Sequence, residues 1–145
     1  VEVAKHVNAH GVHLGRADMY ISEARSILGE HAIIGGTANT LKEVESLITQ
    51  QANYIGLGPY SLTETKKDLS PILGLKGYDD ILNQLKTSYS ISEIPIIAVG
   101  GIDYHNIESI LETGVYGVAV SGFLTNDFSN AERLFTILNK ELWLS

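Results

Sequence analysis

The stretch Tyr54-Ile55-Gly56-Leu57-Gly58-Pro59-Tyr60-Ser61-Leu62-Thr63-Glu64-Thr65-Lys66-Lys67-Asp68 joins a short apolar run to a polar loop. The apolar run has the composition of a buried strand, and Gly58-Pro59 bends the backbone where that strand ends. Thr63 and Thr65 supply hydroxyl donors, and Lys66 supplies a positive charge. These groups suit a phosphate or pyrophosphate held at the carboxyl end of a parallel sheet, where α/β folds place their ligands. A solvated surface loop is the alternative interpretation.

Composition bounds the class of protein. The 145 residues are enough for one domain, so residues 1–145 are expected to form a single domain with a sizeable core. The absence of cysteine excludes a disulfide framework and a zinc–thiolate site. A net charge of −7 argues against non-specific nucleic-acid binding, although local lysines and backbone amides can still bind phosphorylated small molecules. No apolar run is long enough to span a membrane, so we expect a cytoplasmic protein.

Short apolar runs alternate with amphipathic segments along the whole chain. The runs are rich in Val and Ile and close on glycine: Gly11–Gly15, Ala32–Gly35, Tyr54–Gly58, Ile94–Gly100 and Tyr116–Gly122. Apolar residues at helical spacing lie between or after them, at 21–28, 41–48, 81–85, 107–111 and 134–142. This alternation predicts an α/β fold made of βαβ units around a parallel sheet.

Two architectures satisfy this alternation: a flavodoxin-like open sheet and part of a TIM (β/α)₈ barrel. Five strands are too few to close a barrel, and a complete barrel usually takes roughly 200–250 residues. The chain is therefore expected to form either an open sheet or the last five βα units of a barrel. It also starts at Val1 inside an expected helix, which hints that residues precede it.

Candidate binding residues follow the first two predicted strands. Asp18 could bind Mg²⁺, which typically takes one or two carboxylates plus substrate phosphates; the alternative is that it caps the next helix. Thr37 lies among small residues before a helix amino terminus, a combination suited to an anion. The alternative there is an ordinary turn with Thr40 as the helix cap. His13, inside an apolar run, is expected to pack in the interior rather than face a ligand.

The last two predicted strands end in Gly100-Gly101 and Ser121-Gly122. If they are the final strands of a barrel, the loops after them would grip a phosphate. Glycines placed for close helix packing are the alternative. Lys66 is the best candidate for a functional cation, whereas Lys67 is expected to be solvated. The sequence has no nucleophile elbow, Walker loop or dinucleotide fingerprint.

Taken together, these segments resemble the thiamine phosphate synthase family over essentially the whole chain. The segments that carry the resemblance, in the family's order and spacing, are Gly11–Gly15, Asp18, Tyr54–Pro59, Thr63–Lys67, Ile94-Pro95 with Gly100–Ile102, and Gly117–Val120. Thr63-Glu64-Thr65-Lys66 after the glycine–proline strand end is the most specific of them. The resemblance implies a (β/α)₈ barrel of which this chain carries the last five units.

The resemblance also implies a transferase reaction. Members of the family join hydroxymethylpyrimidine diphosphate to thiazole phosphate and release pyrophosphate, with Mg²⁺ and a dissociative mechanism. By position, the residues implied are a magnesium ligand, Asp18; the diphosphate ligands Thr37 and Lys66, the latter also catalytic; the thiazole phosphate site residues Thr63, Glu64 and Thr65; and the binders of that phosphate, Gly101, Ser121 and Gly122.

The chain departs from the family pattern in two ways. Family members usually carry serine where Gly122 stands. Their earlier strands also supply a glutamine, an arginine, a lysine and an asparagine–aspartate pair that this chain does not contain, so the chain alone is expected to be inactive. Two alternatives stay open: a thiazole tautomerase, which would carry histidine near Asn39 and a degraded Thr-Glu-Thr-Lys segment, and a non-catalytic binder of phosphorylated thiazole. A homo-oligomer is possible.

Overall fold

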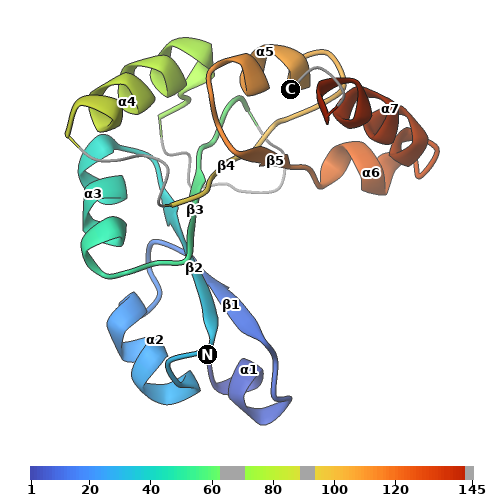
Figure 1. Cartoon of the computed structure of the whole chain (residues 1–145). Coiled ribbons are helices and arrows are strands. Elements are labelled where there is room, and N and C mark those ends of the chain that lie inside the picture. The colour runs from blue at the N-terminus through green and yellow to red at the C-terminus, as the bar shows by residue number, and fades with distance from the viewer. Residues whose placement is uncertain (63–70, 89–93, 143–145) are drawn as a thin grey trace.

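The computed structural model describes residues 1–62, 71–88 and 94–142, which form a five-stranded parallel sheet with helices between the strands (Figure 1). The strands lie in sequence order, β1 (Gly11–Leu14), β2 (Ile33–Ala38), β3 (Tyr54–Leu57), β4 (Ile96–Val99) and β5 (Gly117–Ala119). The helices are α1 (Glu2–His6), α2 (Ile21–Leu28), α3 (Leu41–Thr49), α4 (Gly74–Ser88), α5 (Ile107–Glu112), α6 (Gly122–Asn126) and α7 (Asn130–Leu142). The predicted α/β class and parallel sheet are confirmed.

Two element boundaries differ from the predicted ones. Strand β2 continues past Gly35 to Ala38, because Thr37 and Ala38 pair with Gly56 and Leu57 of β3. Helix α4 begins at Gly74, several residues before the predicted apolar stripe, since the Gly74 amide is held by the Tyr60 carbonyl at 3.0 Å. Long-range backbone pairing therefore sets both boundaries.

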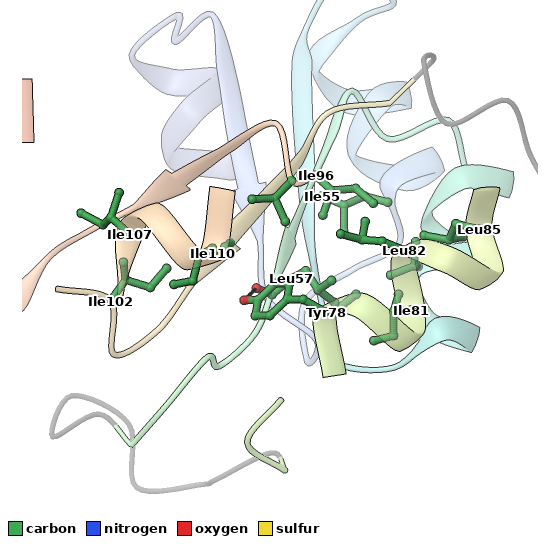
Figure 2. Packing of buried hydrophobic residues seen from close by; sticks show 14 of the residues in the cluster. Ile55, Leu57, Tyr78, Ile81, Leu82, Leu85, Ile96, Ile102, Ile107 and Ile110 are labelled. Carbon is green, nitrogen blue, oxygen red and sulfur yellow. Dashed lines mark hydrogen bonds between the residues drawn. The ribbon is translucent and has the colours of Figure 1, made fainter. Parts of the chain in front are cut away.

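One face of the sheet is buried under helices. In a strand, alternate side chains point to the same face, and here these include Ile34, Ile55, Leu57 and Ile96, all nearly inaccessible to solvent. Helices α2 to α5 lie in an arc along one side of the sheet (Figure 1). Figure 2 shows Tyr78 and other buried residues of α4 gathered with Ile55, Leu57 and Ile96 into one apolar cluster. Ile34 lies in a second buried cluster, with Leu14, Ile21 and Ala24.

The opposite face is more open. It carries the residues of the other parity, which are mostly small, polar or half-buried: His13, Gly35, Thr37, Tyr54, Gly56, Ile97, Val99 and Ala119. Ile33 on this face is 53% exposed. The two faces of the sheet thus differ in kind, one forming the core and one presenting side chains outward.

Arg25 ties the end of α2 to the starts of two strands. Its guanidinium donates to the carbonyls of Ala32 and Gln51 and to Oδ1 of Asn53, each at 3.0 Å. Asn53 Oδ1 also accepts the Ile34 amide at 2.7 Å. A planar fork of donors suits such a convergence of carbonyl groups.

No helix among the described residues is long and apolar enough to traverse a lipid bilayer.

The buried hydroxyl of Tyr78 provides a test of the core. It donates to the Leu57 carbonyl at 2.5 Å, and burial raises its pKa well above the usual value. Tyr78→Phe should lower the free energy of unfolding by about 1 kcal/mol at pH 7 in urea denaturation, because one buried hydrogen bond is lost.

The same substitution should change the alkaline limb of the stability profile. Above pH about 10 the unfolded chain releases the Tyr78 proton and the folded chain does not, so stability falls as pH rises and the Phe variant lacks that part of the fall. Tyr116→Phe, at a residue 78% exposed, is the matched control and should change neither quantity. Equal behaviour of the two variants would contradict the role of the buried hydroxyl.

Candidate functional site

The predicted site residues that the structure describes lie along one edge of the sheet. Because all five strands are parallel and adjacent in sequence order, their carboxyl ends share that edge. Asp18 follows β1, Thr37 is next to last in β2, Gly101 follows β4, and Ser121 and Gly122 follow β5. The predicted residues Thr63, Glu64, Thr65 and Lys66 lie outside the described residues.

Asp18 closes a tight turn at the end of β1. Its Oδ2 accepts the Gly15 amide at 2.6 Å, and its own amide donates to the Gly15 carbonyl at 3.1 Å. The alternative that Asp18 caps α2 is wrong, because Tyr20 is the N-cap and its amide donates to Glu23 Oε2 at 3.2 Å. The turn therefore fixes the carboxylate at the sheet edge, and no residue that the structure describes is hydrogen-bonded to Oδ1.

The described residues contain no group of three or more acidic or histidine side chains that could hold a metal ion by themselves. A single carboxylate at this edge still fits Mg²⁺, which often binds through one or two carboxylates together with substrate phosphates and water. The donor set is thus compatible with a magnesium ion that arrives with a phosphorylated ligand.

In the turn between β2 and α3, side chains of the turn and of the first turn of α3 accept the backbone amides. Thr40 caps α3, and Glu43 Oε2 accepts the amides of Asn39 and Thr40 at 2.7 and 3.0 Å. Arg16 Nε pairs with Glu43 Oε1 at 2.9 Å. The predicted anion site at this helix start is therefore not formed by these amides, and the capped-turn alternative is confirmed. Thr37 itself stands within β2 rather than in the turn.

Thr37 belongs instead to a cluster on the open face of the sheet. His13 Nε2 lies 2.8 Å from Thr37 Oγ1, and His13 Nδ1 lies 3.1 Å from the Tyr54 hydroxyl. The His13 and Tyr54 rings are stacked, with centroids 5.4 Å apart. The expectation that His13 packs in the interior is wrong: its side chain is exposed on this face. Burial raises the pKa of Tyr54, which keeps its hydroxyl protonated.

Two glycines make room for the rings of this cluster. Gly35 stands between His13 and Tyr54 in the register, and a Cβ on it would lie 2.2 Å from the Tyr54 ring. A Cβ on Gly56 would lie 3.1 Å from His13 Cε1. His13 and Tyr54 lie on strands that are separated by β2, so their backbones are about 9.6 Å apart. Their rings can approach each other only across a residue of β2 that has no side chain.

Gly100 and Gly101 hold the chain that leaves β3 against the end of β4. Both adopt positive φ, +87° and +71°. The Tyr60 amide donates to the Val99 carbonyl at 3.0 Å, and Ser61 Oγ donates to the Gly101 carbonyl at 2.8 Å. A Cβ on Gly101 would lie 2.2 Å from Ser61 Oγ. These glycines thus serve the approach of a loop, not the helix packing considered as their alternative.

Asn39 is a buried polar residue for which the sequence predicts no structural role. It is only 3% exposed, and its amide nitrogen donates to the carbonyls of Gly58 at 3.0 Å and Pro71 at 2.7 Å. The segment with the Thr-Glu-Thr-Lys motif lies between these two residues in the sequence. Asn39 therefore binds the described backbone on both sides of that segment.

Ser121 and Gly122 form the junction between β5 and α6. The Ser121 carbonyl accepts the amides of Leu124 and Thr125 at 2.9 and 3.0 Å. Apart from the adjoining backbone, no atom of the described residues lies within 4 Å of where a Cβ on Gly122 would stand. A larger side chain, such as the serine usual in the family that the sequence resembles, would fit there without displacing other atoms.

Gly101 and Gly122 provide a matched pair for a stability test. Gly101→Ala should lower the free energy of unfolding by about 2 kcal/mol or more, because it combines a left-handed backbone with a clash against Ser61 and Leu62. Gly122→Ala should be neutral or slightly stabilising, since alanine favours a helix and meets open space. Urea unfolding of both variants measures the difference, and equal stabilities would contradict the close approach at Gly101.

The comparisons with known proteins point to one family. A family model described as thiamine monophosphate synthase matches residues 1–124. A thiamine-phosphate synthase of Flavobacterium psychrophilum is 54% identical over 98% of this chain and 68% of its own length. One of Bacteroides thetaiotaomicron is 49% identical over 96% of this chain and 66% of its own length.

Solved structures agree with this. A thiamine phosphate pyrophosphorylase of Pyrococcus furiosus superposes with a TM-score of 0.74 at 30% identity, over 96% of this chain and 64% of that one. A nicotinate-nucleotide pyrophosphorylase of Francisella tularensis, 16% identical with a TM-score of 0.58, shares the fold alone. The chain spans about two thirds of the length of the relatives it matches. On this similarity and the fold together, the chain belongs to the thiamine monophosphate synthase family.

Proposed function

We propose that the protein, expressed from its complete coding sequence, joins hydroxymethylpyrimidine diphosphate to thiazole phosphate and releases pyrophosphate. The observation that carries this proposal is the 54% identity to a thiamine-phosphate synthase over nearly the whole chain. The geometry supports it, because Asp18, Thr37 and Gly101 follow or end three strands at one edge of a parallel sheet. Ligands of α/β folds bind at that edge.

In this proposal the diphosphate binds at the carboxyl ends of β1 and β2, the first two strands of the described sheet. Asp18 would hold Mg²⁺ through its carboxylate, and Thr37 with Lys66 would bind the diphosphate. A dissociative reaction needs little acid–base chemistry but strong stabilisation of the departing pyrophosphate. When bound, Mg²⁺ supplies charge neutralisation to that leaving group.

The thiazole phosphate would bind on the other side of the site. Its proposed ligands are Thr63, Glu64, Thr65, Gly101, Ser121 and Gly122. The position of Gly101 supports this, because it follows β4 at the carboxyl edge of the sheet, where α/β folds bind their ligands. At Gly122 the phosphate would rely on the backbone amide and on Ser121, since the usual serine is absent.

We also propose that the sheet is the last five-eighths of a (β/α)₈ barrel. The open face, with Ile33 and the half-buried Ile97 and Val99, has the character of a barrel interior that is only partly enclosed. The superposition on 64% of the Pyrococcus furiosus structure supports the same proportion. Further strands would then cover this face and pair with β1 and β5, whose outer edges are unpaired within the described sheet.

The tautomerase alternative is disfavoured by Asn39. A tautomerase is expected to carry histidine near this position. The Asn39 amide instead donates its hydrogens to two backbone carbonyls and does not act as an acid or a base at neutral pH. A non-catalytic binder of thiazole phosphate would bind that ligand and form no thiamine phosphate in a discontinuous assay with both substrates and Mg²⁺. Formation of the product supports the synthase.

Lys66 should be required for turnover. Lys66→Ala in the complete protein should lower kcat by roughly tenfold or more, because the leaving diphosphate loses a positive charge. Lys67→Ala, one position along, is the matched control and should retain most of the activity. Equal kinetics for the two variants would refute the special role of Lys66.

Asp18 should set the magnesium requirement. Asp18→Asn keeps an oxygen acceptor for the Gly15 amide and so preserves the turn, but removes the charge that would hold the ion. The Mg²⁺ concentration for half-maximal activity should rise by roughly tenfold or more. A titration identical to that of the parent protein would show that Asp18 serves only the turn.

A further inference from the structure

The His13–Thr37–Tyr54 cluster contains a hydrogen-bond chain that the proposed reaction leaves unexplained. His13 stands on β1, Thr37 on β2 and Tyr54 on β3, so three strands contribute to it. The imidazole uses both ring nitrogens, Nε2 toward Thr37 Oγ1 at 2.8 Å and Nδ1 toward the Tyr54 hydroxyl at 3.1 Å. In its neutral form an imidazole has one donor and one acceptor nitrogen, so in that form the two hydroxyls take opposite roles.

The chemistry of the two hydroxyls decides which role each takes. A phenol is a stronger hydrogen-bond donor than an aliphatic alcohol, because its proton is far more acidic. Burial raises the pKa of Tyr54, so its proton is present at neutral pH. The favoured arrangement has Tyr54 donating to Nδ1, which places the ring proton on Nε2 and makes Thr37 Oγ1 its acceptor.

In that arrangement the Thr37 hydroxyl proton cannot point at His13. It is directed away from the ring and is free to donate to an anion on the open face. A threonine hydroxyl otherwise rotates, and its proton can point to any nearby acceptor. Fixing the rotor beforehand removes the cost of ordering it when the ligand binds.

We propose that His13 is a positioning residue that orients the Thr37 hydroxyl to donate to a bound diphosphate, with Tyr54 fixing the tautomer of His13. This inference rests on the proposed function, in which Thr37 binds the diphosphate. His13 acts through Thr37, so its importance depends on the Thr37 hydroxyl. The His13 ring stacks on the Tyr54 ring, and Gly35 and Gly56 leave the space in which the two rings lie. Both features favour the orientation of His13 toward Thr37.

The test is a double-mutant cycle on the affinity of the complete protein for inorganic pyrophosphate with Mg²⁺, measured by calorimetry. Thr37→Val removes the hydroxyl at constant shape, and His13→Phe keeps a ring against Tyr54 without its nitrogens. Thr37→Val should weaken binding by roughly tenfold and His13→Phe by roughly three- to tenfold. The double variant should bind no more weakly than Thr37→Val alone.

Other variants separate positioning from structure. His13→Gln places an amide where Nε2 stands and should restore part of the affinity, and unfolding in urea should show His13→Phe to be folded. The inference would be overturned if Thr37→Val and His13→Phe weakened pyrophosphate binding independently, so that the fold-changes multiply in the double variant. An unchanged affinity in His13→Phe would also overturn it. So would absence of pyrophosphate binding by the parent protein.

A spectroscopic readout is independent of catalysis. Long-range proton–nitrogen NMR of the His13 ring in the ligand-free protein should show the proton on Nε2 and an acceptor Nδ1, and Tyr54→Phe should shift the Nδ1 resonance. The proton on Nδ1 would overturn the inference. If pyrophosphate binds with the expected cycle but no thiamine phosphate is formed, the synthase proposal fails and the positioning role stands.

Discussion

The burial of one parity of strand residues beneath the helices is the constraint on which the rest of the molecule depends. Ile34, Ile55 and Leu57 have no exposed surface, and Ile96 has almost none. Burying such a side chain contributes about 1.5–3 kcal/mol, and a register slip of one residue would turn all of them outward. Because this parity is fixed, the other parity is fixed too, and His13, Thr37 and Tyr54 must share the open face.

A second constraint acts where β3 ends. Asn39 holds the carbonyls of Gly58 and Pro71, and the backbone beyond β3 is also bonded to the end of β4 through Tyr60 and Ser61. These hydrogen bonds hold the described backbone on both sides of the connection whose sequence is most specific to the family.

Much of the fold could be predicted from the sequence, because buried parallel strands leave a plain signal. Runs such as Tyr54–Gly58 are short, apolar and closed by glycine, and all five became strands. The start of α4 was not predictable in this way, since Gly74 and Gly77 are poor helix formers and the helix is set by contacts with Pro59 and Tyr60. Thr37 was expected in a turn and stands in a strand for the same reason: its partner in β3 is distant in sequence.

The location of the site at the carboxyl edge of the sheet was predictable from the sequence, but the contacts of its side chains were not. Parallel strands in sequence order place Asp18, Gly101 and Ser121 along the same edge of the sheet whatever their side chains touch. The face on which His13 lies depends on the register, and an apolar run without alternation does not reveal it. Asn39 gave no signal because its partners are backbone carbonyls, which every residue possesses.

Gly35 shows how a residue without functional groups can govern chemistry. It lies under the Tyr54 ring, and no other amino acid leaves that space empty. A side chain at this position would therefore displace the Tyr54 ring, although glycine itself carries no reactive group. Anyone transplanting the histidine, threonine and tyrosine into another parallel sheet would have to transplant the vacant position as well.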